Sequence, residues 1–402
     1  MPLFSNPVTT ILWLVAILGL FILWHLSREL SRNWKPTRGI WLAGAIGLGL
    51  VALSFKAALM NLLIDNLDHF SQWGQPQRTT VEPVQPTGPG GAGPWVALPL
   101  SPPHPMDNPT NRVKEALGQR LFYDSALSKD GTIACVSCHD LANGGDDGQQ
   151  RSQGIGGALG GRNAPGIWNS AYLSRLFWDG RAASLEDQAQ GPLLHPDEMG
   201  MDSLEQVVKR IKEIEGYPQA FDEAFKQPDA LNAPNLLKAL ATFERTLVQA
   251  NTAYDRYVRG DKQALTAAQK RGMNHFKKLG CRNCHRDPTF SAAGLVKPFG
   301  VYRRFPIHKH TELLTKYRLD QDLGKGHGRW RVPSLRNVAH TAPYFHNGSV
   351  PTLKEAVWLM GKLQLNRTLA PTTIDDLVAF LQAISHQSND ISPKLLAGAQ
   401  QP

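Results

Sequence analysis

Two short stretches of the chain carry the residues whose types and spacing are best suited to chemistry. Each reads Cys-x-x-Cys-His, first at residues 135–139 and again at residues 281–285. On one helical turn the two thiols and the imidazole share a face, so the thiols can bond the two vinyl groups of one porphyrin while the imidazole reaches its iron. This spacing is the attachment signal for c-type haem. The sequence therefore predicts two covalently bound haem c groups, held by Cys135, Cys138 and His139 and by Cys281, Cys284 and His285.

Two other uses of these thiols, the only four in the chain, fit the sequence less well. A zinc ribbon keeps its cysteine pairs about 15–20 residues apart, whereas these pairs lie at 135–138 and 281–284 and each is followed by a histidine. A thioredoxin-like dithiol would sit near a βαβ pattern, and the sequence shows none. Covalent haem is the interpretation that accounts for the spacing of both cysteine pairs and for the histidine after each.

Helical signals surround both stretches, and strand signals are weak. Apolar residues recur at helical spacing in residues 111–122, 204–214, 236–247 and 374–384. Capping boxes begin at Ser184, Ser203, Thr266 and Thr352. We therefore predict a mainly α fold with two c-type cytochrome-like haem domains, an N-terminal one over residues 109–260 and a C-terminal one over 261–402. The formal charge of +9 is too small to argue for nucleic acid in a chain of 402 residues.

Two apolar runs precede the haem domains, at residues 8–24 and 40–55, and the second could continue to residue 64. The first is about as long as a bilayer-spanning helix, and the basic loop between them indicates a cytoplasmic side. We therefore expect a membrane anchor of two transmembrane helices over residues 1–70 and a Pro/Gly-rich linker over 71–108. This predicts a bacterial inner-membrane protein with its haem domains in the periplasm, and a single spanning helix is the alternative.

Longer stretches extend the pattern beyond the haem motifs. The chain reads LGQRLFYDSALS from residue 117, RNAPGIWNSAYLSRLFWDGRAASLEDQAQGPLLHPDEMGMD from residue 162, VPSLRNVAHTAPYFHNGSVPTLKEAV from residue 332 and MGKLQLNR from residue 360. In these collinear stretches, which cover about residues 117–384, the chain resembles the bacterial di-haem cytochrome c peroxidase family, which includes the MauG-type enzymes.

The resemblance implies different tasks for the two haems. The haem at His139 would react with peroxide, and the haem at His285 would take in electrons. The family's methionine ligand to the second haem matches Met360, and His/Met ligation raises a haem's potential. The family's tryptophan between the haems matches Trp178, which would relay electrons from one haem to the other.

The distal residues of the peroxide site also have counterparts. The family's distal acid matches Glu198, which would move a proton from one peroxide oxygen to the other, a task that suits a carboxylate in a partly apolar pocket. The family's distal amide matches Gln188. Without the resemblance, Glu198 would be an ordinary acid of a surface turn, and its neighbour Asp197 could be mistaken for it.

The family further binds calcium between its haem domains. The matching residues are Asn163, through its side chain, and Thr341 and Pro343, through their carbonyl groups. Oxygen ligands suit this cation.

One position departs from the family. Classical members place a histidine ligand in the loop after the first haem motif, and here that position is Ile155, with no histidine between His139 and His195. We therefore predict that the first haem lacks a distal protein ligand in every redox state, so that no reductive activation is needed. His195 is the nearby residue that could overturn this prediction.

The sequence predicts a di-haem c-type peroxidase that reduces hydrogen peroxide to water. One alternative is a MauG-like enzyme that oxidises a protein substrate, and another is a non-catalytic di-haem electron carrier. A small cytochrome c, a cupredoxin or a quinol would supply the electrons, and the resemblance implies a homodimer. A group of basic residues could pair with haem propionates, contact an acidic donor or form a solvated loop: Arg303, Arg304, Lys309, Lys316, Arg318, Lys325, Arg329 and Arg331.

Overall fold

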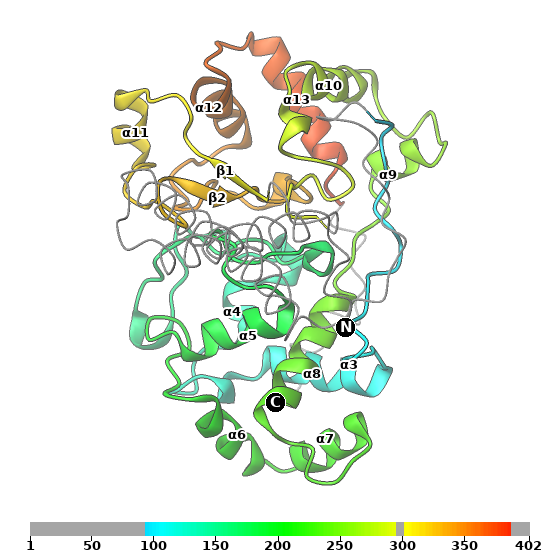
Figure 1. Ribbon diagram of the computed structural model, residues 1–402, viewed down its shortest axis with the longest axis vertical. Coiled ribbons are helices and arrows are strands. Elements are labelled where there is room, and N and C mark those ends of the chain that lie inside the picture. Colours follow the sequence, from blue (N-terminus) through cyan, green and yellow to red (C-terminus); the bar gives the residue numbers. More distant parts are fainter. Residues whose placement is uncertain (1–92, 295–300, 387–402) are drawn as a thin grey trace, which may run out of the picture. The chain divides into compact units, whose positions relative to one another are not determined.

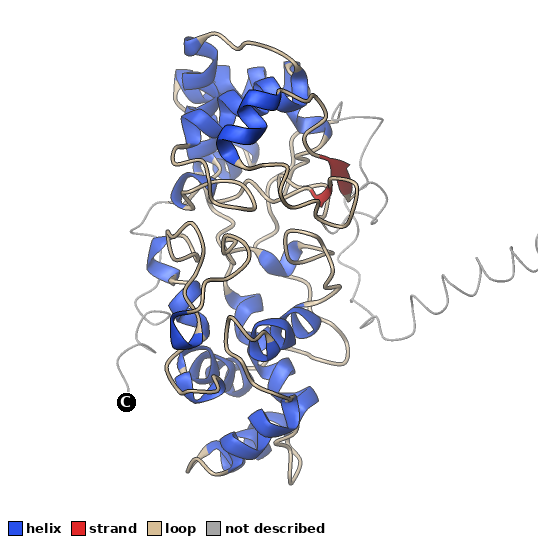
Figure 2. Cartoon of the chain, turned by 90° about the vertical axis from the view of Figure 1, so that its left-hand side faces the viewer, coloured by secondary structure: helices blue, strands red, loops and turns tan. Residues whose placement is uncertain are grey.

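The computed structural model describes residues 93–294 and 301–386, and within these ranges the chain is mainly helical (Figures 1 and 2). The α-helices are α3 (Arg112–Tyr123), α4 (Cys135–Cys138), α5 (Leu185–Leu194), α6 (Leu204–Lys212), α7 (Tyr217–Phe225), α8 (Ala233–Thr246), α9 (Ala253–Val258), α10 (Ala267–Lys278), α11 (Thr311–Tyr317), α12 (Leu353–Leu365) and α13 (Pro371–Ala383). The strands β1 (Tyr302–Arg304) and β2 (Arg329–Arg331) pair antiparallel, with Arg303 opposite Trp330.

Short 3₁₀ turns occupy much of the remaining chain. They are η1 (Ser125–Leu127), η2 (Leu141–Asn143), η3 (Ile155–Gly157), η4 (Ser170–Tyr172), η5 (Cys281–Asn283) and η6 (Val338–His340). The long glycine-rich stretch after His139 therefore contains no α-helix until α5 begins at Leu185. Its backbone contacts distant segments: the Ile155 amide donates to the Glu198 carbonyl and the Asn163 amide to the His346 carbonyl.

One apolar core lies among α3, α5, α6, α7 and α8. The side chains of Phe122 and Phe243 are fully buried, with ring centroids 5.2 Å apart. Helices α3 and α8 approach so closely that a Cβ at Gly118 would lie 2.0 Å from the carbonyl oxygen of Ala239, so only glycine fits there. The predicted cap at Ser203 is confirmed, since its hydroxyl accepts from the Gln206 amide at the start of α6.

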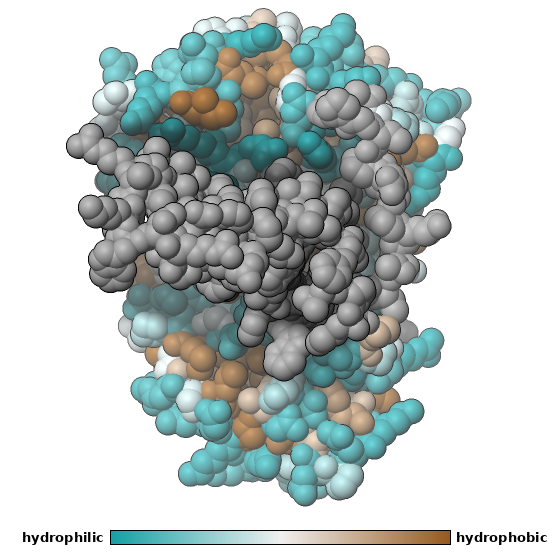
Figure 3. All heavy atoms as spheres, viewed as in Figure 1, coloured by the Kyte–Doolittle hydropathy of each residue, from teal (hydrophilic) through white to brown (hydrophobic). Residues whose placement is uncertain are grey.

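A second core lies where α10 packs against α13. Its buried rings include Tyr254 and Phe290, with centroids 5.0 Å apart, and Phe276 and Phe380, 5.3 Å apart. The predicted capping box at Thr266 is confirmed at the start of α10. Figure 3 shows apolar side chains at the surface in the region of α12 and α13, among polar neighbours.

Residues 93–108, part of the predicted linker, lie against both cores. The ring of Trp95 packs on Tyr254 and Phe380, with centroids 6.0 Å away in each case. The Arg282 guanidinium, inside the second Cys-x-x-Cys-His motif, lies 4.0 Å from the centre of the Trp95 ring. Further along, Asn108 donates to the Glu186 carboxylate on α5 at 2.8 Å. The first residues of the described chain therefore pack against the second core through Trp95 and against α5 of the first core through Asn108.

The predicted transmembrane helices and inner-membrane location require correction. In residues 93–294 and 301–386 no helix is long and apolar enough to cross a membrane. The longest there, α8, has 14 residues, whereas about 20 are needed to span the hydrocarbon core of a bilayer. The apolar runs at 8–24 and 40–64, on which the prediction was based, lie outside the described residues. We therefore withdraw the membrane anchor from the fold and from the location of the protein.

Candidate active site

The first Cys-x-x-Cys-His motif forms the four-residue helix α4 and the histidine that follows it. Nδ1 of His139 lies 3.0 Å from the carbonyl oxygen of Gly145, so the ring is oriented with Nε2 as its remaining nitrogen. Desolvation lowers the pKa of His139 and raises that of the Cys135 thiol. A neutral imidazole with a free Nε2, beside two unionised thiols, suits attachment of a haem through this motif.

The second motif forms a 3₁₀ turn instead of an α-helix, but its histidine amide donates to the carbonyl of the first cysteine, as in the first motif. Cys281 begins η5, and the ring of His285 is held by Nδ1 contacts of 3.2 Å to the Phe290 carbonyl and 3.3 Å to the Pro333 carbonyl. Burial lowers the pKa of His285 to about 4. The imidazole is therefore neutral at physiological pH, with Nε2 available for a metal.

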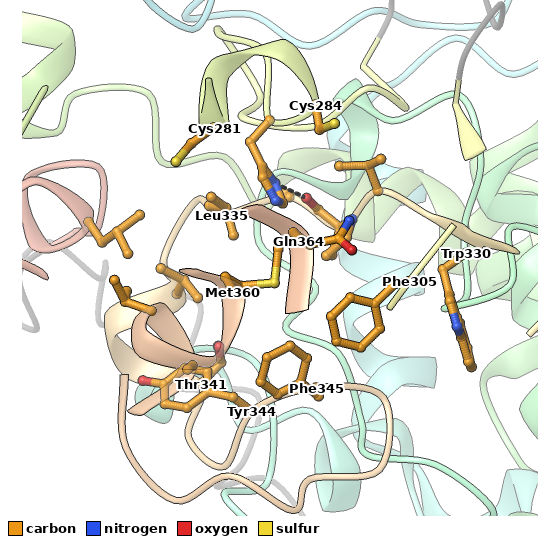
Figure 4. A pocket seen from close by; sticks show the side chains of 18 of the residues that line it. Cys281, Cys284, Phe305, Trp330, Leu335, Thr341, Tyr344, Phe345, Met360 and Gln364 are labelled. Carbon is orange, nitrogen blue, oxygen red and sulfur yellow. Dashed lines mark hydrogen bonds between the residues drawn. The ribbon is translucent and has the colours of Figure 1, made fainter. Parts of the chain in front are cut away.

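A cavity of about 330 Å³ adjoins the second motif, lined by Cys281, Cys284 and His285 and by Met360 of α12. Figure 4 shows the two cysteines on one side of the cavity and the Met360 side chain extending toward them from the other. Most of the lining is apolar, with Leu335, Phe345 and other aliphatic and aromatic side chains. Imidazole and thioether donors on opposite walls of an apolar cavity fit a six-coordinate haem.

The candidate distal acid lies in a tight turn that follows α5. The Glu198 amide donates to the His195 carbonyl, and the Glu198 carbonyl accepts from the Ile155 amide at 2.9 Å. A Cβ at Gly154 would lie 2.1 Å from the Asp197 carbonyl oxygen, so the loop carrying Ile155 packs directly on this turn because Gly154 lacks a side chain. Residues 154–155 and 197–198 therefore form one unit.

The Glu198 carboxylate interacts electrostatically with its neighbours and with the first motif. Burial raises the pKa of Glu198, and this is partly offset by His195, whose Nδ1 is 3.9 Å from a Glu198 oxygen, and by Arg181. The pKa of the Cys138 thiol is raised mainly by burial, with smaller contributions from Asp147 and Glu198. The Glu198 carboxylate is thus close enough to act electrostatically on the first haem-attachment site.

The other two predicted catalytic residues lie on separate elements. Gln188 is half-buried on α5, the helix capped by Ser184 that leads into the Glu198 turn. Trp178 lines the cavity of the second motif, and its indole Nε1 donates to the Asn163 carbonyl at 2.8 Å. The structure therefore brings Trp178 next to the second site and to the segment of a predicted calcium ligand.

All three predicted calcium ligands line the same cavity. The Asn163 amide nitrogen donates to the Gln149 carbonyl at 2.9 Å, which leaves its Oδ1 as the free oxygen. Within the described part of the chain, no hydrogen bond is made to that oxygen or to the carbonyl oxygens of Thr341 and Pro343. Three oxygens without a hydrogen-bond partner among the described residues thus belong to residues that line one cavity, although they come from two segments far apart in the sequence.

Two residues that the sequence analysis did not select also belong to this region. His346 stacks on Trp330 with ring centroids 4.1 Å apart and meets Trp178 edge-on at 6.5 Å. Asp146 is fully buried, and neither of its carboxylate oxygens has a hydrogen-bond partner among the described residues. His346 follows Tyr-Phe in a stretch quoted for the family resemblance. Asp146 lies in the sequence Gly-Gly-Asp-Asp, which predicts a loop and no functional site.

Two oriented Cys-x-x-Cys-His sites in a mainly helical chain define a c-type cytochrome with two haem-attachment sites. The family profile described as di-haem cytochrome c peroxidase matches residues 112–263, and one described as RoxA-like, cytochrome c-like matches residues 330–358. The chain belongs to the di-haem cytochrome c peroxidase family, as its relatives confirm. Two c-type haems are therefore its cofactors, and it is an oxidoreductase of this class.

The relatives include both named branches of the family. The chain is 41% identical to cytochrome c peroxidase Ccp of Escherichia coli over 288 residues, which are 70% of this chain and 60% of that protein. It is 36% identical to cytochrome c551 peroxidase of Pseudomonas aeruginosa over 302 residues, 72% of this chain and 83% of that protein. It is 34% identical to the methylamine utilization protein MauG of Methylorubrum extorquens over 312 residues, 71% of this chain and 82% of the relative.

Among solved structures, the chain is similar to a MauG-like protein associated with microbial copper homeostasis. The TM-score is 0.62 at 29% identity, over 77% of this chain and 98% of that one. The match supports the helical di-haem fold.

Proposed function

We propose that this protein reduces hydrogen peroxide to water at a haem bound to Cys135, Cys138 and His139. One observation carries the proposal: the loop that contains Ile155 packs directly on the turn that contains Glu198, beside the first motif. An aliphatic side chain cannot ligate iron, so the distal side of this haem stays open. A partly buried carboxylate is available at the same place.

The residues divide the chemistry between them. A haem at this site supplies the iron at which peroxide binds and its O–O bond breaks. Glu198 would take a proton from one peroxide oxygen and give it to the other, so that this second oxygen can leave as water. The Gln188 side-chain amide would donate a hydrogen bond to the peroxide. Two electrons and two protons are consumed for each peroxide, and two water molecules are formed.

Electrons enter at the second site, where His285 and Met360 serve as the iron ligands. A small cytochrome c is the donor that we propose, because relatives of this chain are named cytochrome c551 peroxidases. Trp178 lines the second cavity and carries electrons onward to the first haem.

The open first haem is tested by electron paramagnetic resonance of the fully oxidised protein. We expect a high-spin ferric signal from the first haem beside a low-spin signal from the second. One equivalent of peroxide should remove the high-spin signal without prior reduction. Two low-spin signals that ignore peroxide would reject the proposal in favour of an electron carrier, or would identify His195 as a distal ligand.

Trp178 is tested by its replacement with phenylalanine. The W178F variant loses both the indole and its hydrogen bond to Asn163, so we expect slower electron transfer between the haems with unchanged spectra of each. Stopped-flow reduction of peroxide-treated protein measures this rate. The W95F variant is the control, because Trp95 lies in the second core and does not line the cavity. Equal rates in both variants would remove the relay role.

Calcium is the second cofactor that we propose, bound by Asn163, Thr341 and Pro343. Its support is the three unoccupied oxygens and the buried Asp146 carboxylate, which is close enough to Tyr344 to contribute to the raised pKa of that phenol. Oxygen ligands and a nearby negative charge favour calcium over softer metals. The site joins segments from both halves of the chain, so its occupancy should stabilise their packing.

Removal of the Asn163 side-chain oxygen tests the calcium site. In the wild type, a calcium concentration about 100-fold above its dissociation constant should add about 2.7 kcal/mol to the free energy of unfolding. The N163A variant should lose this calcium-dependent gain in melting temperature. The N143A variant, which changes an exposed asparagine, should keep it. A wild-type melting temperature that is unaffected by a chelator would contradict the proposal.

One observation favours the MauG-like alternative: position 155 holds isoleucine where classical members of the family have a histidine ligand. Met360 on the wall of the second cavity favours the peroxidase instead, because the resemblance implies a tyrosine ligand at this haem in MauG-type enzymes. We therefore rank peroxide reduction first. The spectrum of the second haem, with a methionine or a tyrosine signature, distinguishes the two.

A further inference from the structure

Arg331 is a buried cation on the wall of the second cavity. It ends β2, is 4% exposed, and lines the cavity that also contains Cys281 and His285. Its Nε donates to the Phe177 carbonyl at 2.6 Å, and its main-chain amide donates to the Trp178 carbonyl at 3.2 Å. One terminal nitrogen of the guanidinium, Nη1, is fully buried and has no hydrogen-bond partner in the described part of the chain.

Within residues 93–294 and 301–386, no carboxylate forms an ion pair with this guanidinium. Tyr302 and Asp179 are the groups that act on its charge electrostatically. Asp179 forms ion pairs with Arg162 at 2.8 Å and Arg181 at 3.1 Å instead. The Tyr302 hydroxyl donates to the Gly180 carbonyl. A buried charge without a counter-ion is strongly unfavourable, so this position in the cavity favours a ligand group that carries a negative charge.

We propose that Arg331 binds a propionate carboxylate of the second haem and fixes it to the backbone that carries Trp178. This inference deepens the proposed function, because it rests on haem binding at the second motif. Guanidinium groups pair with carboxylates through two parallel hydrogen bonds. A haem c attached at Cys281 and Cys284 brings two carboxylates, and one of them satisfies the unpaired Nη1 of Arg331.

The backbone beside Arg331 gives this contact a second consequence. Phe177 has φ of 64°, a left-handed conformation that is unfavourable for a residue with a large side chain. Its carbonyl accepts hydrogen bonds from Arg331 Nε and from the Gly180 amide. Arg331 therefore stabilises the strained turn of residues 177–180, which contains Trp178. The Arg331 side chain therefore contacts both the propionate and the backbone that positions the Trp178 indole, so a shift of one should move the other.

The charge of Arg331 should also set the redox equilibrium of the second haem. A cation near the iron favours the ferrous state over the more positive ferric state. Replacement by glutamine keeps an amide that can donate to the Phe177 carbonyl but removes the charge. We expect the potential of the second haem to fall in R331Q, with a roughly tenfold or larger decrease in the equilibrium constant for reduction by a fixed donor.

Spectroelectrochemical titration of the purified di-haem protein measures this potential without peroxide, so the result does not depend on catalysis. R331K, which keeps the charge, should retain most of the wild-type potential. R329Q is the matched control, because Arg329 is on the same strand but is exposed and does not line the cavity. If R331Q keeps the potential of the wild type and of R329Q, Arg331 only supports the Phe177 turn and the inference is rejected.

Resonance Raman spectra give a second readout. The propionate bending band of the second haem should shift in R331K, because an ammonium group replaces the planar guanidinium at the carboxylate. Should R331Q fail to retain its second haem, this band decides the question: a shift supports the propionate contact, and a band identical to that of the wild type rejects it. If an Arg331 variant loses peroxidase activity but keeps the wild-type propionate band of the second haem, the defect lies at the first haem and the Arg331 inference is rejected.

Discussion

Replacement of Glu198 by glutamine is expected to lower the rate of peroxide reduction by roughly 10²–10⁴-fold. Glutamine has nearly the same size and can keep the main-chain bonds of the turn, including the one from the Ile155 amide. It cannot accept a proton from peroxide and return it. The loss should therefore appear in the reaction of the oxidised protein with peroxide, measured by stopped-flow absorbance. The spectra of both haems should be unchanged.

The neighbouring acid provides the matched control for this experiment. Asp197 is exposed on the same turn, and its carboxylate is the one that could be misassigned. D197N should therefore react with peroxide at nearly the wild-type rate. An electron carrier would transfer electrons equally well in wild type, E198Q and D197N. A wild-type peroxide rate in E198Q would contradict the assigned role of Glu198.

The pH dependence should follow from the same residue. Burial raises the pKa of Glu198, and His195 and Arg181 only partly offset this effect. The carboxylate acts as a base, so activity should be complete above its folded pKa and should fall as the pH drops through that value. The fall should begin at a higher pH than for an ordinary glutamate. In E198Q, the residual peroxide rate should lack this acid limb.

Replacement of Met360 by leucine is expected to change the ligation of the second haem and to abolish most donor-driven turnover. Leucine is close to methionine in volume, so α12 should retain its packing. The thioether sulfur is lost, however, and with it the second of the two iron ligands, His285 and Met360, that we propose for this haem. We expect a lower potential at this haem, because thioether ligation raises it. Electrons from a small cytochrome should then enter unfavourably.

Spectra and kinetics separate this effect from a general disturbance of the fold. The ferric spectrum of the second haem should lose its low-spin His/Met character in M360L, while the high-spin signal of the first haem stays. M273L makes the same exchange in α10, where Met273 is buried in the second core and does not line the cavity. It should leave both spectra and the turnover unchanged. A low-spin His/Met signature that persists in M360L would assign the ligand elsewhere.

The sequence by itself determined the features that depend on neighbours within one or two helical turns. The two Cys-x-x-Cys-His motifs need only one turn to place two thiols and an imidazole on one face. The caps at Ser203 and Thr266 are likewise local, and α6 and α10 begin where these residues predict. The absence of a histidine between residues 139 and 195 is also a fact of the sequence alone. The membrane helices that hydropathy predicted lie outside the described residues, and among the helices of the described residues none is long and apolar enough to cross a membrane.

Tertiary structure decided which distant residues meet and which polar groups lose their water. Nothing in the sequence indicated that Gly154 would allow the Ile155 loop to touch the Glu198 turn. Eight basic residues between 303 and 331 looked alike in the sequence. Only the fold shows that Arg331 is buried against the second cavity and has no carboxylate partner among the described residues. The oxygens of Asn163, Thr341 and Pro343 come from segments far apart along the chain. Burial and long-range contacts depend on how whole helices pack, and the local periodicity of a sequence does not predict that packing.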